Sequence, residues 1–121
     1  MWITIQDDHR ISKRAAKALA HPGARLFVSV ITIWEILIKR HAEKLLTSLS
    51  PEAIVNGIRT QTVWRILPLE IEHIQAFNDI DRFTDHTDPF DRMLIAQAMS
   101  EDLSMMTADR HFERYKINVI W

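Results

Sequence analysis

Three acidic residues stand where a parallel α/β fold places its active site, near the carboxyl ends of strands. Glu35 follows the apolar run 26–30, Asp109 follows the run 105–107, and Asp91 lies in the first turn of an expected helix. Carboxylates from three distant segments can together hold Mg²⁺ or Mn²⁺, which prefer oxygen ligands. Such an ion lowers the pKa of a bound water and stabilises charge on a phosphodiester. The pattern therefore favours a metal site that hydrolyses phosphodiesters.

Each of these carboxylates also has a purely structural interpretation. Glu35 follows Thr32 by three residues, which is the spacing of a capping box. Asp88 and Asp91 stand at the cap and first turn of their helix, where the helix dipole favours a negative charge by roughly 0.3–1 kcal/mol. Asp109 has the position of a cap for the short turn that follows it. Taken singly, each residue fits the structural interpretation better, but the three together are harder to explain in that way.

Basic residues and one histidine lie close to the acids in the sequence. We interpret His86 as a residue that positions its loop rather than as a metal ligand. Lys39 follows Glu35 by one helical turn, so it forms either an ion pair with Glu35 or a contact to a phosphate. Arg92, with Arg110 and Arg114, flanks the acids and is a candidate for holding a phosphate backbone, with a solvated helix face as the alternative.

The elements that must position these residues alternate between strands and helices. Apolar, β-branched runs predict strands, while capping residues and apolar residues three or four apart predict helices. The expected order is a helix at 11–20, a strand at 26–30, helices starting at 32 and 50, a strand at 63–69, helices at 71–80 and 89–102, a strand at 105–107, a helical turn at 110–115 and a strand at 117–121. The alternation predicts a single α/β domain with a parallel sheet and helices on both faces.

The same periodicity predicts which side chains face inward. Apolar residues at helical spacing should form the buried faces of two helices. These are Ile71, Ile74, Phe77 and Ile80 in one helix, and Ile33, Ile36 and Leu37 in the other, with Ile38 at the margin. Three tryptophans, Trp34, Trp64 and Trp121, should pack in the core or at the edge of the sheet.

The composition excludes several classes of protein. The 121 residues, 14.2 kDa in mass, suffice for one domain. The chain has 15 basic and 16 acidic residues and therefore a net charge of -1. Because this balance gives no overall attraction to a polyanion, any contact with RNA must come from a local basic patch. The absence of cysteine removes disulfides, thiolate metal sites and cysteine nucleophiles. Two glycines cannot build a phosphate-binding glycine loop, and no apolar run reaches the roughly 18 residues of a membrane span. We expect a small cytoplasmic α/β domain.

Three segments carry a resemblance to a known family. Residues 29–39, SVITIWEILIK, resemble the second-strand and helix signature of PIN-domain ribonucleases, in particular VapC-type toxins of type II toxin–antitoxin systems. Residues 86–98, HTDPFDRMLIAQA, match the pattern H-x-D-P-F-D-R-x-L-I-A-Q-A of that family almost residue for residue. Residues 106–109, with Phe112, Tyr115 and the end at 119–121, resemble its C-terminal pattern. The resemblance covers nearly the whole chain.

The resemblance implies a PIN-like fold and a set of acids that bind Mg²⁺ or Mn²⁺. It assigns Glu35, Asp91 and Asp109 as catalytic and metal-binding residues, with Asp88 as a helix cap and Thr107 as a hydroxyl beside the last acid. The implied activity is hydrolysis of RNA by a metal-activated water. The implied partners are an RNA substrate, a cognate antitoxin that blocks the site and a second copy of the chain.

One acid of the family pattern has no counterpart here. The family carries it at the end of a first strand, whereas Trp2 matches the last position of that segment. Asp7 and Asp8 match the loop that follows, so neither replaces the missing carboxylate. We therefore interpret residues 1–121 as one PIN domain that lacks its first strand, in which residues 1–5 can fill part of the gap as a strand.

Three hypotheses follow from the sequence. The first is a metal-dependent endoribonuclease toxin, and the second is a remnant that binds antitoxin or RNA without turnover, since one acid is missing. The third and weakest is an unrelated α/β domain whose acids are only helix caps, in which case alanine at each acid would cost about 1 kcal/mol of stability and metal would not raise the melting temperature.

Overall fold

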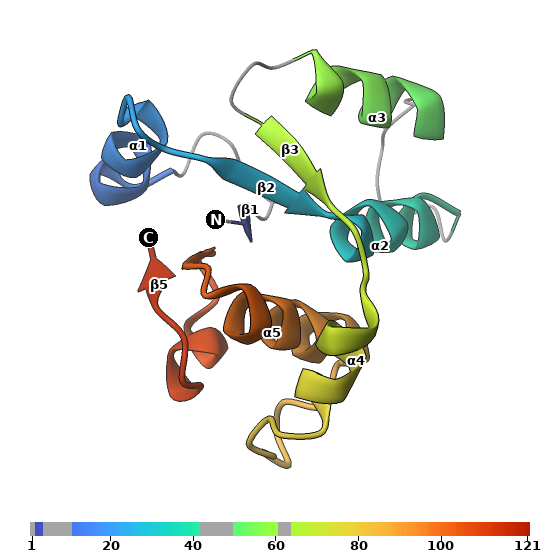
Figure 1. Cartoon of the computed structure of the whole chain (residues 1–121), viewed down its shortest axis with the longest axis vertical. Coiled ribbons are helices and arrows are strands. Elements are labelled where there is room, and N and C mark those ends of the chain that lie inside the picture. Colours follow the sequence, from blue (N-terminus) through green and yellow to red (C-terminus); the bar gives the residue numbers. More distant parts are fainter. Residues whose placement is uncertain (1, 4–10, 42–49, 61–63) are drawn as a thin grey trace.

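The computed structural model describes residues 2–3, 11–41, 50–60 and 64–121 of the chain. Strands and helices alternate as the sequence predicts, with end points shifted by a few residues (Figure 1). The elements are β1 (Trp2–Ile3), α1 (Lys13–Ala20), β2 (Leu26–Ser29), α2 (Val30–His41), α3 (Pro51–Arg59), β3 (Trp64–Leu67), α4 (Ile71–Phe77), α5 (Pro89–Glu101), β4 (Met105–Met106), the 3₁₀ helix η2 (Arg110–Arg114) and β5 (Val119–Ile120). In this part of the chain no helix is long and apolar enough to cross a membrane.

Every paired strand in the described sheets is parallel. One sheet has the order β1-β4-β5 and the other pairs β2 with β3, and β1 also lies close to β2. Trp2 pairs with Met105 and Ile3 with Met106, so the strand predicted near the N-terminus is confirmed over these two residues. Met1, Thr4 and Ile5 of the predicted strand lie outside the described residues.

Helices cover both faces of this sheet, as predicted. Successive residues of a strand point to opposite faces. Met105 belongs to the core cluster formed with α5, and its register partner Val119 packs against the same cluster. Met106 packs instead with Ala15 of α1, and its register partner Ile120 joins that second cluster. Therefore α5 and α1 lie on opposite faces.

Side-chain caps fix the beginnings of three helices at the predicted residues. The Ser12 hydroxyl accepts a hydrogen bond from the backbone N–H of Ala15, and Ser50 accepts one from Ala53. Asp88 accepts hydrogen bonds from the first turn of α5, with Pro89 as the first helical residue. These caps satisfy backbone donors that have no partner within the helix.

The cap at Asp88 predicts an effect on stability. Its Oδ1 accepts from the N–H of Phe90 at 2.8 Å and from that of Asp91 at 3.3 Å. We expect Asp88→Ala to lower the free energy of unfolding by about 1 kcal/mol, because both donors lose this partner. Asp88→Asn should keep nearly wild-type stability, since asparagine also caps helices well. Urea unfolding monitored by tryptophan fluorescence tests this, and equal midpoints for Asp88→Ala and the wild type would contradict it.

The apolar face predicted for α4 is wrong at two positions. Ile71 and Ile74 are 65% and 49% exposed, while Ile80 is buried and Phe77 is partly buried. His73, between the two exposed isoleucines, is instead fully buried. A helix of seven residues has only two turns, so its apolar periodicity is a weak indicator of the buried side. The hydrogen bonds of the His73 ring offset the cost of burying it, and tertiary contacts therefore determine which side of α4 faces inward.

Two predictions for α2 are also wrong, namely the packing of Trp34 in the core or at the sheet edge and the inward position of Ile38 at the margin of the apolar face. Trp34 is 56% exposed and Ile38 is 41% exposed, whereas Ile33 is buried and Ile36 and Leu37 are partly buried. Trp34 packs edge-on against Phe90 at the start of α5, with ring centroids 4.9 Å apart. The apolar run in α2 is longer than the face that the fold covers, and part of it therefore meets solvent. Trp64 and Trp121 pack against the α1 cluster as predicted.

Candidate active site

Glu35 lies in the second turn of α2, and the capping-box interpretation of this residue is wrong. The helix begins at Val30, so Thr32 is already helical. Ser29 stands immediately before the helix, and its Oγ accepts a hydrogen bond from the N–H of Ile31 at 3.0 Å. Glu35 is therefore too far along the helix to cap its start, and its partly buried carboxylate needs another explanation.

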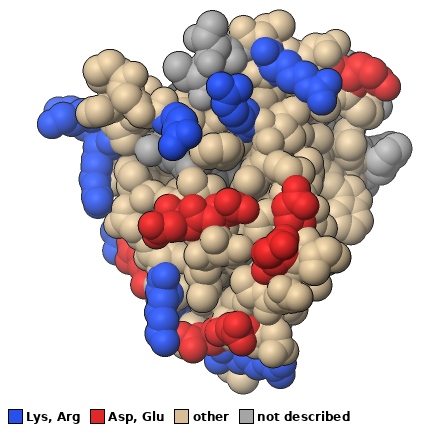
Figure 2. All heavy atoms as spheres, viewed as in Figure 1, with Lys and Arg blue, Asp and Glu red and all other residues tan. Residues whose placement is uncertain are grey.

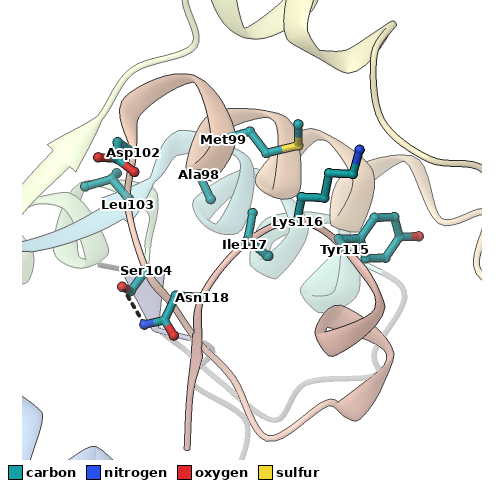
Figure 3. A pocket seen from close by; sticks show the side chains of 9 residues that line it. All are labelled: Ala98, Met99, Asp102, Leu103, Ser104, Tyr115, Lys116, Ile117 and Asn118. Atoms are coloured by element: carbon teal, nitrogen blue, oxygen red, sulfur yellow. Dashed lines mark hydrogen bonds between the residues drawn. The ribbon is translucent and has the colours of Figure 1, made fainter.

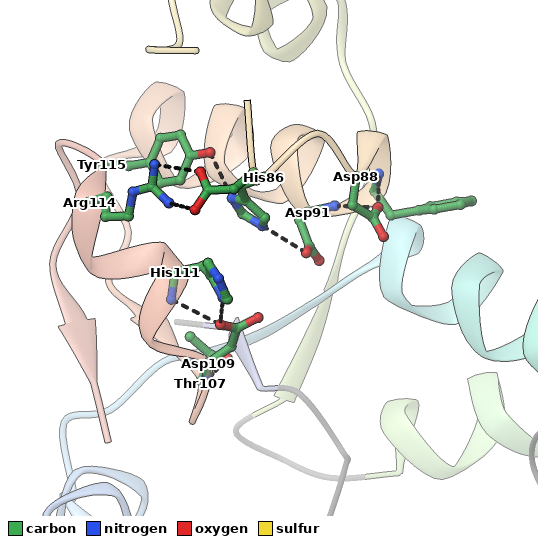
Figure 4. A network of polar contacts seen from close by, with 10 residues as sticks. His86, Asp88, Asp91, Thr107, Asp109, His111, Arg114 and Tyr115 are labelled. Carbon is green, nitrogen blue, oxygen red and sulfur yellow. Dashed lines mark hydrogen bonds and ion pairs between the residues drawn. The ribbon is translucent and has the colours of Figure 1, made fainter. Parts of the chain in front are cut away.

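Asp91 is the third residue of α5, directly after the Asp88 cap and Pro89. Its side chain is 23% exposed, and its Oδ2 lies 3.0 Å from Nε2 of His86. The other ring nitrogen of His86, Nδ1, lies 2.7 Å from the hydroxyl of Tyr115 (Figure 4). His86 thus holds Asp91 and the loop before α5 in place, which agrees with the positioning role expected of it.

The pKa of Asp91 is raised above its ordinary value. Burial of the carboxyl is the main cause, and the negative charges of Asp88 and Glu35 add to it, while the hydrogen bond and charge of His86 act in the opposite direction. Glu35 and Asp91 are 56 positions apart in sequence, but the helices that carry them are in contact in the fold. The contact between the two helices brings this pair to the same part of the fold, while the convergence of all three acids on one metal stays a prediction.

Asp109 follows β4 and caps η2. Its Oδ1 accepts a hydrogen bond from the N–H of His111 at 2.9 Å and lies 2.8 Å from Nδ1 of the same residue. Thr107, which is buried, accepts a hydrogen bond at Oγ1 from the N–H of Asp109 at 3.1 Å. The structural interpretation of Asp109 as a cap is confirmed, and the predicted hydroxyl beside it is in contact.

The pKa of Asp109 is lowered. Burial alone would raise it, but the backbone and side-chain hydrogen bonds of His111 and the charges of His111 and His86 together outweigh burial. His111 was not among the residues singled out from the sequence. The one available signal was its place two residues after a candidate acid.

The two histidines link the two aspartates. The rings of His86 and His111 stack with their centroids 5.4 Å apart and their planes 25° from parallel. The result is a continuous series, Asp91–His86–His111–Asp109, which joins the start of α5 to the start of η2 (Figure 4). The sequence pattern placed both aspartates and His86 near one site, but it did not single out the ring of His111.

The lowered pKa of Asp109 predicts a pH-dependent contribution to stability. The ionised carboxylate stabilises the folded state at pH values above the unfolded pKa of about 3.9, and this contribution is lost as the pH falls through the lower folded pKa. We expect Asp109→Ala to reduce the free energy of unfolding by about 1 kcal/mol at pH 7 and by less near pH 3. Urea unfolding at a series of pH values tests this. A difference from wild type that stays constant down to pH 3 would show that the charge contributes nothing.

The basic residues near the site occupy different environments. Arg92 is buried, donates from its guanidinium to the carbonyl of Asp81 at 3.1 Å and lies over the ring of Phe77, which favours a structural role over contact with phosphate. Arg114 forms a bidentate ion pair with Asp85. Lys39 lies in α2, but its side chain is outside the described residues, as are Asp7 and Asp8.

The described side chains do not by themselves form a site that fits a divalent ion. No group of three or more Asp, Glu or His side chains in this part of the chain is placed to hold one metal. One oxygen of Asp91 lies against His86, and one of Asp109 lies against His111. The donor types suit Mg²⁺ or Mn²⁺, but Glu35, Asp91 and Asp109 do not converge on a single point.

A cavity of about 540 Å³ lies apart from these acids, between the end of α5 and the segment that leads into β5 (Figure 3). Its charged lining residues are Asp102 and Lys116, and none of the predicted catalytic residues lines it. The candidate active site is therefore defined by the carboxylates and histidines at the strand ends.

The comparisons with known proteins place this geometry in a family. No curated protein matches the chain. A scan against protein families matches residues 1–118 to the family described as PIN domain. PIN domains are generally nucleases that use divalent metal ions and act on RNA or other nucleic acids. The parallel sheet covered by helices on both faces and the acids at its strand ends agree with that match, and the chain belongs to the PIN domain family.

Proposed function

We propose that this chain is a VapC-type toxin, an endoribonuclease that hydrolyses RNA phosphodiester bonds and depends on Mg²⁺ or Mn²⁺. The observation that supports it most directly is the proximity of Glu35 and Asp91, whose charges interact, at the strand ends of a PIN domain. Asp109 completes the proposed acidic set, with His86 and Thr107 as supporting residues. Metal dependence rests on the family, because the described side chains do not group three ligands around one ion.

A local basic surface offers a place for the RNA backbone. Between residues 13 and 25 the chain has four basic residues, all exposed, and no acid. Arg14 and Lys17 of α1, with His21, line a cavity of about 470 Å³. Figure 2 shows acidic side chains across the middle of one face of the molecule, with several Lys and Arg side chains above them. Segregated charge of this kind allows a chain of net charge -1 to bind a polyanion.

The basic surface predicts a salt-dependent contribution to RNA binding. We expect the double variant Arg14→Ala/Lys17→Ala to weaken binding of a single-stranded RNA and to reduce the slope of log K against log salt by roughly 1.4, if each side chain neutralises one phosphate. Fluorescence anisotropy at several salt concentrations measures this. Arg59→Ala, an exposed cation on α3, is the matched control. An unchanged slope in the double variant would exclude α1 from the RNA contact.

The decisive experiment for the nuclease is cleavage of a mixed RNA substrate by the purified chain with Mn²⁺ or with EDTA. We expect cleavage with Mn²⁺, none with EDTA, and a large loss in Glu35→Gln. Glu72→Gln, an exposed glutamate on α4, should cleave like the wild type. Cleavage that persists in EDTA, or in Glu35→Gln, would contradict the proposal.

A second function is favoured by a specific observation. Since the described acids do not converge and Asp91 and Asp109 are each held by a histidine, the chain also fits a PIN-domain remnant that binds antitoxin or RNA without turnover. In that case the anisotropy assay would detect bound RNA while the cleavage assay stays silent at every metal concentration.

The resemblance to VapC toxins extends the proposal to partners. We propose a cognate antitoxin that covers the site, assembly as a homodimer and a cytoplasmic location. Expression of the chain alone should then arrest growth, and coexpression of the antitoxin should relieve the arrest. A toxic effect that persists in Asp109→Ala would argue against ribonuclease activity as its cause.

A further inference from the structure

A buried phenol, an imidazole and a carboxylate form one hydrogen-bonded series beside the candidate site. The hydroxyl of Tyr115 lies 2.7 Å from Nδ1 of His86, and Nε2 of His86 lies 3.0 Å from Oδ2 of Asp91. Tyr115 and His86 are 5% and 7% exposed, so water competes little for either hydrogen bond. The three residues come from η2's C-cap, the loop before α5 and α5 itself.

The chemistry of the three groups sets the direction of the hydrogen bonds. An ionised carboxylate only accepts, so Nε2 of His86 carries a hydrogen and donates it to Asp91. In the neutral ring Nδ1 then accepts, and the Tyr115 hydroxyl donates to it. Oδ1 of Asp91 takes part in no hydrogen bond with the described part of the chain. The series therefore engages one carboxylate oxygen, Oδ2, and not the other.

Aromatic neighbours hold the His86 ring in this orientation. The ring stacks on His111 and meets Phe112 edge-on, with centroids 5.4 and 5.5 Å away. Phe83 packs at nearly a right angle against Tyr115, with centroids 5.2 Å apart. The Tyr115 ring also forms part of the wall of the 540 Å³ cavity, and its hydroxyl points away from that cavity (Figure 3). A phenol fixed in this way can do more than fill the core.

We propose that Tyr115 is a positioning residue of the nuclease site: through His86 it fixes which oxygen of Asp91 faces the substrate. The proposal rests on the proposed function for the role of Asp91. The hydroxyl of Tyr115 never reaches the substrate, and its effect passes through the tautomer and orientation of the His86 ring. Partners that orient a site residue in this manner typically affect activity by 10- to 100-fold.

The test is Tyr115→Phe, which keeps the ring and removes only the hydroxyl. We expect kcat for RNA cleavage to fall about tenfold with KM unchanged. The ¹⁵N-detected spectrum of the His86 ring should show protonated Nε2 and bare Nδ1 in the wild type. In Tyr115→Phe the Nε2 proton should exchange faster with water, because the ring is no longer held from its other side.

Ser50→Ala is the matched control. It also removes a hydroxyl that takes part in a hydrogen bond, here with the N–H of Ala53 at the start of α3, a helix that carries none of the candidate site residues. It should lower stability and leave both kcat and the His86 signal unchanged. An equal loss of kcat in the two variants would mean that Tyr115 acts only through stability, and this would overturn the proposal.

The spectrum separates this proposal from the proposed function. If the wild type does not cleave RNA, the nuclease fails, while slow Nε2 exchange that is lost in Tyr115→Phe still supports positioning of Asp91. A wild-type His86 protonated at Nδ1 and bare at Nε2 would overturn the proposal directly, even if Tyr115→Phe does not fold.

Discussion

Asp91→Asn is expected to abolish RNA cleavage while leaving the folded chain at least as stable as the wild type at pH 7. The loss of cleavage should be at least about 100-fold, since a positioned carboxylate contributes roughly 10²–10⁴-fold in catalysis. Asparagine has nearly the same shape, and its Oδ1 can still accept the hydrogen bond from Nε2 of His86. The substitution therefore removes the charge with little change in packing.

The stability part of this prediction follows from the sign of the pKa shift. Burial, with the charges of Asp88 and Glu35, raises the pKa of Asp91 above its unfolded value despite the opposing effect of His86. A raised carboxyl pKa means that the protonated form stabilises the fold, and that this contribution is lost as the pH rises through the folded pKa. At pH 7 the ionised group is a net cost, which asparagine does not carry.

Cleavage rates and urea unfolding, measured on the same preparations, check both parts. Asp79→Asn, at an exposed aspartate after α4, should change neither activity nor stability. Retained cleavage in Asp91→Asn would remove this residue from the active site. A clear loss of stability would show that its carboxylate is mainly structural, as the helix-dipole interpretation holds.

The beginnings of the helices were predictable because they depend on local chemistry. A Ser or Asp that caps, followed by Pro or an apolar run, determines where a helix starts with little help from the rest of the chain. The starts after Ser12, Ser50 and Asp88 are of this kind and are confirmed. The start of α2 was predicted at the wrong residue. Val30 follows directly on a strand, and the Ser29 hydroxyl also forms a hydrogen bond with Gln97 of α5, a residue far away in the sequence.

The sequence pointed to the acids of the candidate site but not to the hydrogen bonds and ring contacts that join them. Their spacing relative to the strands predicted that Glu35 and Asp91 lie near each other, and the helices that carry them are in contact, while their role as ligands stays a prediction. The roles of His111 and Tyr115 arise because η2 folds back against the loop before α5, bringing residues almost 30 positions apart within 3 Å. The spacing of residues along the sequence does not predict such a long-range contact.

The same limit explains α4, where the sequence pattern and the structure disagree about which side is buried. His73 accepts a hydrogen bond at Nδ1 from the N–H of Glu70 at 3.0 Å, and its Nε2 lies 2.7 Å from Oε1 of Glu101. The side-chain nitrogen Nε2 of Gln97, in α5, lies 3.4 Å from Nδ1 of His73. A polar residue with such hydrogen-bond partners is stable in the interior. A prediction based on apolar periodicity alone places the same residue on the exposed side of the helix.

This arrangement predicts the largest stability loss at a polar residue. We expect His73→Ala to lower the free energy of unfolding by about 2–4 kcal/mol, because it opens a cavity at a fully buried side chain and leaves the N–H of Glu70 without its partner. Ile74→Ala, at the next position, should cost less than about 1 kcal/mol because that side chain is already half exposed. Urea unfolding of the two variants gives the ranking directly. A larger loss of stability in Ile74→Ala than in His73→Ala would contradict this prediction. It would mean that α4 packs through the isoleucine face that its sequence pattern predicts, and that other side chains form the contact between α4 and α5.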